Sequence, residues 1–454
     1  MKKNRLHACV AGCVILLLSS CLGNGDSETD EWNLSNCQIV SFSLQNDSIP
    51  GLSDVKFTID QLNGLIFNKD SMLYGTQINW KVVCSATYVV TPSAIEVYQE
   101  ATKDSAYWNS SDSLDFSDFV RFRVYSYDGK AYKAYTARLN IHQQEPDSMT
   151  WTLCAERLTG KNMQEQKVIA ANGFYWMYVK SADGYELYKS PATDAENWTK
   201  TPLNGLSDKT FVLSQITEYE GVLYLPASDG TCYASIDGVN WDIEKDTPDI
   251  RVLLGTVEAS PQVKRPSALA AVIREGDVWR FAAMDADAHW KTGAAIPETF
   301  PVTGFGAASY EQMYYRHLIV VAGKDRNGGL SNTAWDTMDG LSWVRLTDEG
   351  ASFFEAREGV MLTQYDEKLF LIGGIDASNR AIKDIYRSID KGITWNLADT
   401  LIVLPETYRA RGYASMLVDQ DHFILLFGGK ESKNANVLDE LWRGRINRLG
   451  FFDK

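Results

Sequence analysis

A chain of 454 residues exceeds the size of one ordinary domain, so two or more folded units are expected. Its composition, 45% hydrophobic with 22 Tyr and 13 Trp, favours a globular protein rich in β-structure over a helical bundle. The formal net charge is −15 and no basic run follows the first few residues, which argues against nucleic acid as a partner, because phosphate binding needs concentrated Lys and Arg.

The chain begins with a targeting segment. A positive start, with Lys2, Lys3 and Arg5, precedes an apolar run shorter than the ~20 residues needed to cross a bilayer. The run ends in Leu18-Ser-Ser-Cys21, which resembles the bacterial lipobox. That resemblance implies cleavage before Cys21 and lipidation of its sulfur, so residues 1–20 are predicted to be a lipoprotein signal peptide. An ordinary signal peptide and an N-terminal membrane helix are the alternatives.

Residues 21–32 form a polar, acidic tether that is predicted to be flexible. Acidic tethers directly after the lipidated cysteine resemble the surface-export signals of Bacteroides-type lipoproteins. This resemblance implies a protein anchored to the outer membrane through Cys21 and exposed on the cell surface. A spacer on a periplasm-facing protein is the alternative. No other apolar run is long enough to span a bilayer, so the lipid is the expected anchor.

Four cysteines remain after processing, namely Cys37, Cys84, Cys154 and Cys232. They lie in a compartment where disulfides form, and Cys37 with Cys84 is a candidate bridge; a buried thiol is the default expectation for all four. The sequence contains neither a CxxC motif nor a Cys/His cluster. No metal and no cofactor are therefore predicted.

Residues 33–145 show repeated short strands and almost no helical periodicity. The clearest hairpin joins residues 120–127 to residues 132–141 through the turn Asp128-Gly129. This pattern predicts a β-sandwich. The stretch resembles the immunoglobulin-like modules at the front of Bacteroides-type surface lipoproteins, which implies a spacer. Polar residues around Pro146 predict a linker at 146–148.

A turn motif recurs through the rest of the chain. Ser388-Ile-Asp-Lys-Gly-Ile-Thr-Trp395 places an aspartate where its carboxylate folds back onto turn amides, a glycine where φ is positive, and a tryptophan beneath the turn. These residues match the Asp-box pattern of sialidase-like β-propellers. Shorter or degenerate copies end at Trp198, Trp241, Trp290 and Trp343, and this spacing of 43 to 53 residues predicts four-stranded propeller blades.

The ends of the array set the number of blades. Glu440-Leu-Trp-Arg-Gly444 aligns with Asp384-Ile-Tyr-Arg-Ser388 as a third strand, and no fourth strand follows it. Thr150-Trp-Thr-Leu153 is a fourth strand with no blade before it, so the strand near Trp151 is predicted to close the last blade and remove both exposed edges. The sequence therefore predicts an all-β protein with a six-bladed propeller at 149–446 and a tail at 447–454. Seven blades are the alternative.

Apolar second strands that end in glycine occur in the last three blades, at 318–323, 369–374 and 423–429. They resemble kelch repeats, in which glycine permits a tight exit from the strand. The lipobox, the immunoglobulin-like module and the kelch/Asp-box propeller together resemble a family of uncharacterised Bacteroides-type surface lipoproteins over the whole mature chain. The resemblance implies a fold and a location, but no reaction.

The side chains of the turn motif are predicted to be structural, because turn closure is what their spacing does. They are Asp237, Asp339, Asp390, Trp241, Trp343 and Trp395. His289 and His317 lie in or beside predicted strands, where a packed histidine is commoner than a catalyst, and no Ser-His-Asp arrangement is recognisable.

Arginines form the candidate ligand site. Arg265, Arg357 and Arg411 each precede an apolar strand that is interpreted as the innermost of its blade, with Tyr408 and Arg409 nearby in sequence. Their guanidiniums are expected to converge at the mouth of the central channel, where planar forks suit a carboxylate or sulfate. Pairing of each arginine with a neighbouring acid is the alternative.

Two enzyme comparisons bear on function. Sialidases share six blades, Asp boxes and three arginines that grip a substrate carboxylate; kelch-type sialate epimerases are the second comparison. The Arg-Ile-Pro motif of sialidases is absent, and Tyr310, Tyr408 and Glu406 are candidates for their nucleophile pair by position only. The predicted function is therefore non-catalytic binding of an acidic glycan or a protein at the channel mouth. A glycan-active enzyme and a structural subunit of an outer-membrane complex are the alternatives.

Overall fold

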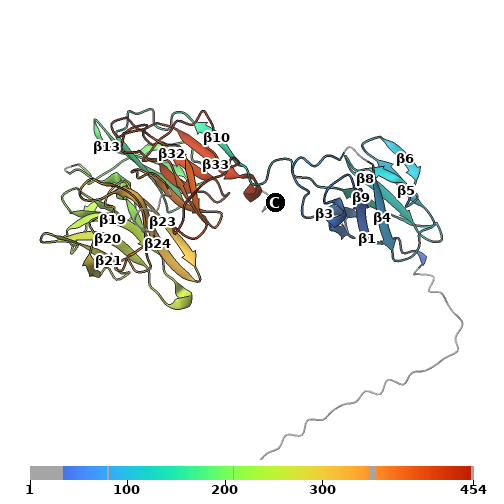
Figure 1. Cartoon of the computed structure of the whole chain (residues 1–454), viewed down its shortest axis with the longest axis horizontal. Coiled ribbons are helices and arrows are strands. Elements are labelled where there is room, and N and C mark those ends of the chain that lie inside the picture. The colour runs from blue at the N-terminus through green and yellow to red at the C-terminus, as the bar shows by residue number, and fades with distance from the viewer. Residues whose placement is uncertain (1–33, 79–80, 208, 347–353, 451–454) are drawn as a thin grey trace, which may run out of the picture. The chain divides into compact units, whose positions relative to one another are not determined.

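The computed structural model describes residues 34–78, 81–207, 209–346 and 354–450. The predicted signal peptide, the lipidation site and the acidic tether lie outside these residues. The chain divides into two compact units, with the boundary between Glu145 and Pro146 (Figure 1). Strands dominate both units, and within the described ranges no helix is both long and apolar enough to span a membrane.

Two sheets build the N-terminal unit. One contains β1 (Ile39–Gln45), β4 (Lys81–Tyr88) and β7 (Ser113–Asp115). The other runs in the order β2 (Phe57–Asp60), β3 (Leu65–Asn68), β9 (Tyr132–Arg138), β8 (Val120–Tyr125), β5 (Ile95–Gln99) and β6 (Asp104–Tyr107). A single turn of 3-10 helix, η1 (Leu52–Asp54), follows β1. The hairpin predicted from Asp128-Gly129 is β8–β9, and Gly129 has a φ of 70°.

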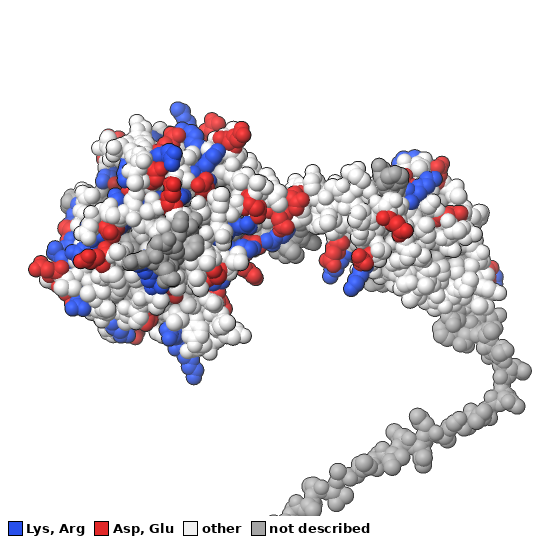
Figure 2. Space-filling model, viewed as in Figure 1, with Lys and Arg blue, Asp and Glu red and all other residues white. Residues whose placement is uncertain are grey.

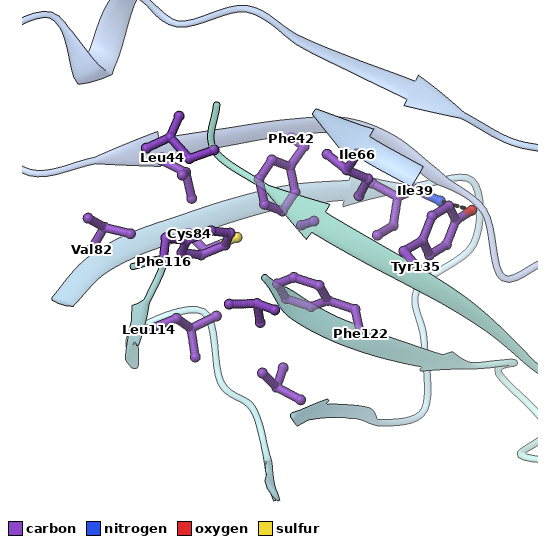
Figure 3. Packing of buried hydrophobic residues seen from close by; sticks show 14 of the residues in the cluster. Ile39, Phe42, Leu44, Ile66, Val82, Cys84, Leu114, Phe116, Phe122 and Tyr135 are labelled. Atoms are coloured by element: carbon purple, nitrogen blue, oxygen red, sulfur yellow. Dashed lines mark hydrogen bonds between the residues drawn. The ribbon is translucent and has the colours of Figure 1, made fainter. Parts of the chain in front are cut away.

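The core of this unit lies between its two sheets (Figure 3). Strand β8 alternates strictly, so that Val120, Phe122 and Val124 are buried while the residues between them face outward. Phe42 of β1 meets the ring of Phe122 edge to face at 5.8 Å, which joins the two sheets. Each sheet thereby covers the apolar face of the other, which makes the unit a β-sandwich.

The cysteines of the described residues are free thiols, so the candidate bridge between Cys37 and Cys84 is not formed. Cys84 is fully buried in the sandwich core, and desolvation raises its pKa to about 12. The default expectation of a buried thiol describes Cys37, Cys84 and Cys232, whereas Cys154 is half-buried.

Six four-stranded sheets form the second unit, and we number these blades in chain order. Blade 1 contains β11 (Glu165–Ala171), β12 (Phe174–Ser181), β13 (Gly184–Pro191) and β14 (Thr199–Thr201); blade 2 contains β15 (Thr217–Tyr219), β16 (Val222–Pro226), β17 (Cys232–Ser235) and β18 (Asp242–Ile243). Blade 3 contains β19 (Ile250–Val257), β20 (Ala268–Glu275), β21 (Val278–Met284) and β22 (Trp290–Ala295).

Blade 4 contains β23 (Gly306–Gln312), β24 (Tyr315–Lys324), β25 (Leu330–Thr337) and β26 (Val344–Arg345), and blade 5 contains β27 (Met361–Tyr365), β28 (Lys368–Ile372), β29 (Ile385–Ser388) and β30 (Asn396–Leu397). Blade 6 combines β31 (Ser415–Val418), β32 (Ile424–Phe427) and β33 (Leu441–Ile446) with β10 (Met149–Ala155). Short 3-10 turns are η2 (Leu213–Gln215), η3 (Pro261–Val263) and η4 (Asn447–Gly450).

The pairing of β10 with β33 closes the ring. Trp151 of β10 lies opposite Gly444 of β33 in an antiparallel register, although nearly 300 residues separate the two strands. The indole of Trp151 packs directly against the backbone of Gly444. Glycine is required there, because a Cβ on residue 444 would come within 2.3 Å of the ring. First strands of neighbouring blades lie side by side from β15 through β19, β23, β27 and β31 to β11, and β11 contacts η2 of blade 2. The all-β architecture with a six-bladed propeller is confirmed.

The turn between the third and fourth strands has the same hydrogen bonds in several blades. In blade 5, Asp390 Oδ1 accepts from the Thr394 amide at 2.8 Å, and the Gly392 amide donates to Ser388 Oγ at 2.7 Å. The Trp395 indole is 2% exposed and donates to the Gly392 carbonyl at 3.2 Å. The turns at Asp237 and Asp339 repeat this pattern, with Trp241 and Trp343 donating to Gly238 and Gly340.

Candidate ligand site at the centre of the propeller

Arg357 and Arg411, which precede the first strands of blades 5 and 6, are buried rather than open to the channel. Arg357 is 1% exposed, and it donates to the backbone carbonyls of Glu355 at 2.9 Å and Gly373 at 3.3 Å. Arg411 is fully buried, and it donates to the carbonyls of Arg409 at 2.9 Å and Gly428 at 3.0 Å. Both therefore brace the glycine at the end of the second strand of their own blade.

The glycines complete this repeated arrangement. Gly374 has a φ of 108°, and a Cβ there would lie 2.9 Å from Cδ of Arg357. Gly429 has a φ of 94°, and its Cβ would lie 2.8 Å from Cδ of Arg411. The paired glycines of the second-strand motif thus leave room for the stem of a buried arginine.

The remaining residues of the predicted arginine cluster do not meet at the channel. Arg411 also pairs with Glu440 at 2.8 Å and stacks over the ring of Tyr408, which is 2% exposed. Arg409 pairs with Glu440 and Glu431. Local pairing, the alternative expected from sequence, therefore describes Arg409 and Arg411.

Arg265 belongs to a different strand from the one expected. It precedes β20, which is the second strand of blade 3, because β19 supplies the first. Its guanidinium is exposed and lies over the ring of Tyr315 at 5.5 Å. The interpretation of 268–275 as an innermost strand is therefore wrong; its unbroken apolar run is explained by burial on both faces within the blade.

A cavity of about 400 Å³ lies among the first strands, where loops from five of the six blades meet. The beginnings of first strands and the ends of second strands share one end of an antiparallel blade, so both kinds of segment reach this mouth. The lining side chains include Lys167, Lys324, Lys430, Lys433, Glu165, Glu358 and Tyr413. The four lysines exceed the two glutamates by two positive charges.

Glu358 joins three blades at this cavity. It is 2% exposed, and its carboxylate pairs with Lys324 of blade 4 at 3.0 Å and with Lys433 of blade 6 at 2.6 Å. Tyr413 donates its hydroxyl to the same carboxylate at 2.5 Å. Burial acts to raise the pKa of Glu358, but hydrogen bonds from Lys433, Tyr413 and Lys324 outweigh it and hold the pKa below its ordinary value.

Two lysines of the cavity have no carboxylate at ion-pair distance within the described part of the chain, and these are Lys167 and Lys430. Desolvation lowers the pKa of Lys167, a residue of β11. Desolvation also lowers the pKa of Lys430, while Glu165 acts in the opposite direction. Glu165 itself pairs with Lys180 at 3.4 Å. The site therefore holds two partly desolvated ammonium groups whose charge the protein leaves unbalanced.

Two of the cavity lysines occupy a recognisable position in the sequence that the prediction from arginines did not include. Lys324 directly follows Gly323, and Lys430 directly follows Gly429, so both extend a second strand beyond its terminal glycine into the cavity mouth. Lys167 lies within an ordinary first strand and carries no such mark. The cavity lining also contains Glu358, which directly follows Arg357, and Tyr413, which lies two residues after Arg411.

The pair Tyr413–Glu358 is not arranged as a nucleophile and base. Desolvation and the neighbouring Glu358 raise the pKa of Tyr413, so its hydroxyl stays protonated and donates. Two ammonium groups already occupy the carboxylate that would have to take up its proton. Tyr310, a positional candidate from sequence, is buried and donates to Asp336 at 2.9 Å instead; Glu406 is exposed.

The histidines occupy other places. His317 lies 2.9 Å from Asp336 and stacks on Tyr310 inside blade 4. His289 shares an exposed turn with Asp285 and Asp287, and their side-chain ligand atoms lie within 4.8 Å of one another. Lys291 already pairs with Asp285 at 3.0 Å in that turn. Over the propeller face seen in Figure 2, acidic and basic side chains intermingle.

Two family descriptions match the sequence. The DUF6242 beta propeller domain matches residues 145–454, and the Domain of unknown function (DUF6242) N-terminal domain matches residues 33–139. No curated protein matches. A solved structure titled "Structure of YjhT" is 12% identical, covers 71% of this chain and 91% of that one, and superposes with a TM-score of 0.33. A likeness this distant carries no argument about the site.

Proposed function

The chain belongs to the DUF6242 family, and we propose that it is a lipid-anchored surface protein that binds an acidic glycan, without catalysis, in the central cavity of its propeller. The observation that carries this proposal is the pair of unbalanced ammonium groups, Lys167 and Lys430, at the cavity. A ligand carboxylate or sulfate would supply the charge that the protein leaves out, in a setting where desolvation strengthens the attraction.

The size of the cavity favours the end of a glycan over a flat protein surface. About 400 Å³ falls within the range of small-ligand sites, which enclose most of the molecule they bind. Lysines are flexible point charges, so they select for charge more than for the planar shape of a carboxylate. Anchoring through the predicted lipid on Cys21 would hold this cavity at the cell surface.

Catalysis by a glycan-active enzyme is the weaker alternative. Glycoside hydrolysis ordinarily needs two carboxyl groups with separate roles beside the scissile bond. The cavity lining offers Glu358, which two lysines hold, and Glu165, which pairs with Lys180. Glu358 is therefore unsuited to act as a general acid, since its pKa is lowered rather than raised.

The test is a glycan array that carries uronic acid, sulfated and neutral glycans, probed with the soluble protein and its Lys167→Gln/Lys430→Gln variant. Charge-assisted contacts contribute about 1.5–3 kcal/mol each, so the variant should lose about 100-fold or more in affinity for acidic glycans. The matched control is Lys245→Gln/Lys264→Gln, which removes two exposed propeller lysines outside the cavity.

Three outcomes would overturn the proposal. They are equal binding by the two double variants, binding of neutral glycans as tight as that of acidic ones, and no binding by a folded protein. Loss of an array signal with time, accompanied by a released product, would replace the binding function with the enzyme alternative.

A further inference from the structure

The outer face of the six-stranded sheet in the N-terminal unit combines exposed tyrosines with arginines. The register places Glu96 and Tyr98 of β5 opposite Arg123 and Arg121 of β8, and Tyr107 of β6 opposite Glu96. All of these lie on the face opposite the buried Val97, Phe122 and Val124, because side chains alternate along a strand. They therefore share one side of the sheet, away from the sandwich core.

The same face continues onto β9. Tyr125 pairs with Tyr132, whose ring lies 5.7 Å away, and Arg138 stands at the far end of the strand. Tyr107 is 76% exposed and Tyr132 is 57% exposed. We define the tyrosine–arginine face by Tyr98, Tyr107, Arg121, Arg123, Tyr132 and Arg138. It crosses four adjacent strands, a width of about 15 Å at ~4.8 Å per strand.

Aromatic rings hold the guanidiniums of this face in place. Arg121 lies 4.9 Å from the ring of Phe119 and 5.8 Å from that of Tyr98. Arg123 lies 5.6 Å from the ring of Tyr132, and Arg138 lies 5.9 Å from that of Phe119. A guanidinium that rests on a ring keeps its N–H donors available at its edge, where they match a carboxylate or sulfate.

Two of the three arginines of the face form ion pairs, and the third does not within the described part of the chain. Arg123 pairs with Glu96 at 3.2 Å, and Arg138 reaches Asp118 at 4.0 Å. Arg121 makes no ion pair with any described residue. A third carboxylate, Glu100, accepts from Tyr98 at 3.0 Å and pairs with Lys103. Three guanidiniums and one ammonium group thus meet three carboxylates, so the face carries one positive charge in excess on a protein whose net charge is −15. Exposed pairs contribute only about 0–1 kcal/mol, so an acidic ligand could displace Glu96 or Asp118 at little cost.

We infer that the tyrosine–arginine face is a second binding surface, and that its ligand is an acidic polysaccharide. Exposed tyrosine rings offer flat apolar area for sugar rings, and the guanidiniums offer paired donors for the acidic groups. The face is open and crosses several strands, so it suits an extended chain of sugars, whereas the propeller cavity suits a chain end. This surface is independent of the propeller site and gives the N-terminal unit a function beyond that of a spacer.

The experiment measures binding of the soluble two-unit protein to immobilised heparin and polygalacturonate, with dextran as the neutral probe and polyglutamate as the acidic peptide. The Arg121→Gln/Arg123→Gln variant should bind both acidic polysaccharides at least tenfold more weakly. Tyr107→Ala should lower the affinity for both polysaccharides by several fold. Higher salt should lower the affinity of the unmodified protein for both acidic polysaccharides towards that of the double variant.

Two controls isolate the face. Lys81→Gln removes an exposed charge from β4 on the other sheet and should retain polysaccharide binding. The Arg121→Gln/Arg123→Gln substitutions are also compared within the Lys167→Gln/Lys430→Gln background, which removes the cavity lysines, and the tenfold difference should persist there. Thermal unfolding monitored by circular dichroism checks that each variant is folded. The inference is overturned if the arginine variant binds as the unmodified protein does, if dextran binds equally, or if no polysaccharide binds. It is also overturned if polyglutamate binds as tightly, since that would identify an acidic protein as the partner.

Discussion

At the scale of single residues, two arginines that were predicted to bind a ligand instead stabilise the fold. Arg357 and Arg411 occupy equivalent places in blades 5 and 6, and each donates to a carbonyl two residues before itself and to the first glycine of a Gly-Gly pair. Blade 6 adds Glu440, which accepts from Arg411 at 2.8 Å. A guanidinium with this many fixed partners stabilises its blade and is not available to a ligand.

Arg411→Met should therefore destabilise the propeller strongly. The substitution keeps the apolar stem but leaves the Gly428 carbonyl and the Glu440 carboxylate buried with fewer partners, a change that costs about 3–5 kcal/mol. Urea unfolding followed by tryptophan fluorescence measures it. The half-buried Arg280, which pairs with the exposed Glu275, provides the control, and Arg280→Met should change stability by less than about 1 kcal/mol. Equal stability of the two variants would contradict the bracing role of Arg411.

At the scale of elements, the strand β10 decides whether the propeller has free edges. It enters blade 6 from the opposite end of the sequence and pairs with β33 over residues Met149–Ala155. Without it, β33 would expose a row of unpaired backbone groups, and Trp442 and Ile446 would lose part of their cover. The ring is thus closed by backbone pairing between the two ends of the propeller segment.

A chain that begins at residue 157 should fail to form a stable monomeric propeller, whereas a chain that begins at residue 146 should retain it. The two chains differ by the closing strand, so the comparison isolates its contribution. Size-exclusion chromatography and the steepness of urea unfolding distinguish them. A monomer of undiminished stability from residue 157 onward would show that the ring closes without β10.

At the scale of the whole molecule, carboxylates tied to turns set the response to acid. Hydrogen bonds from the amides of Asn240 and Val239 lower the pKa of Asp237 to about 2, and a hydrogen bond from Lys209 lowers that of Asp229 to about 2. A carboxyl whose pKa is lower in the folded than in the unfolded protein contributes stability above the unfolded value of about 4. That contribution is lost as the pH falls through the folded value.

The free energy of unfolding should accordingly decrease as the pH is lowered from about 4 to about 2. Asp237→Asn should reduce the steepness of that decrease and lower the stability at pH 7, because its amide accepts from the turn less strongly than a carboxylate. Asp242→Asn, on the exposed strand β18, is the matched control. Urea titrations at several pH values provide the measurement, and an unchanged pH slope in Asp237→Asn would contradict this account.

The repeat, and with it the fold, could be predicted from the sequence. The hydrogen bonds of Asp237, Asp339 and Asp390 are local, since each carboxylate accepts from amides only a few residues away. The residues that form each turn are therefore adjacent in the sequence and can be recognised there. The unmatched fourth strand at Trp151 and the unmatched third strand at Trp442 likewise fixed the count of blades, because a propeller leaves no open edge.

Which charged side chains reach the ligand site depends on contacts between blades, and these could not be predicted from the sequence. Whether a side chain faces the channel or the interior of its blade depends on neighbours far away in sequence, such as Gly373 for Arg357 or Lys433 for Glu358. The pattern along β19 and β20 could not distinguish an inner strand from the one beside it, since both are buried on two faces. The unpaired charge of Lys167 is likewise a property of what surrounds it, which no spacing of residues records.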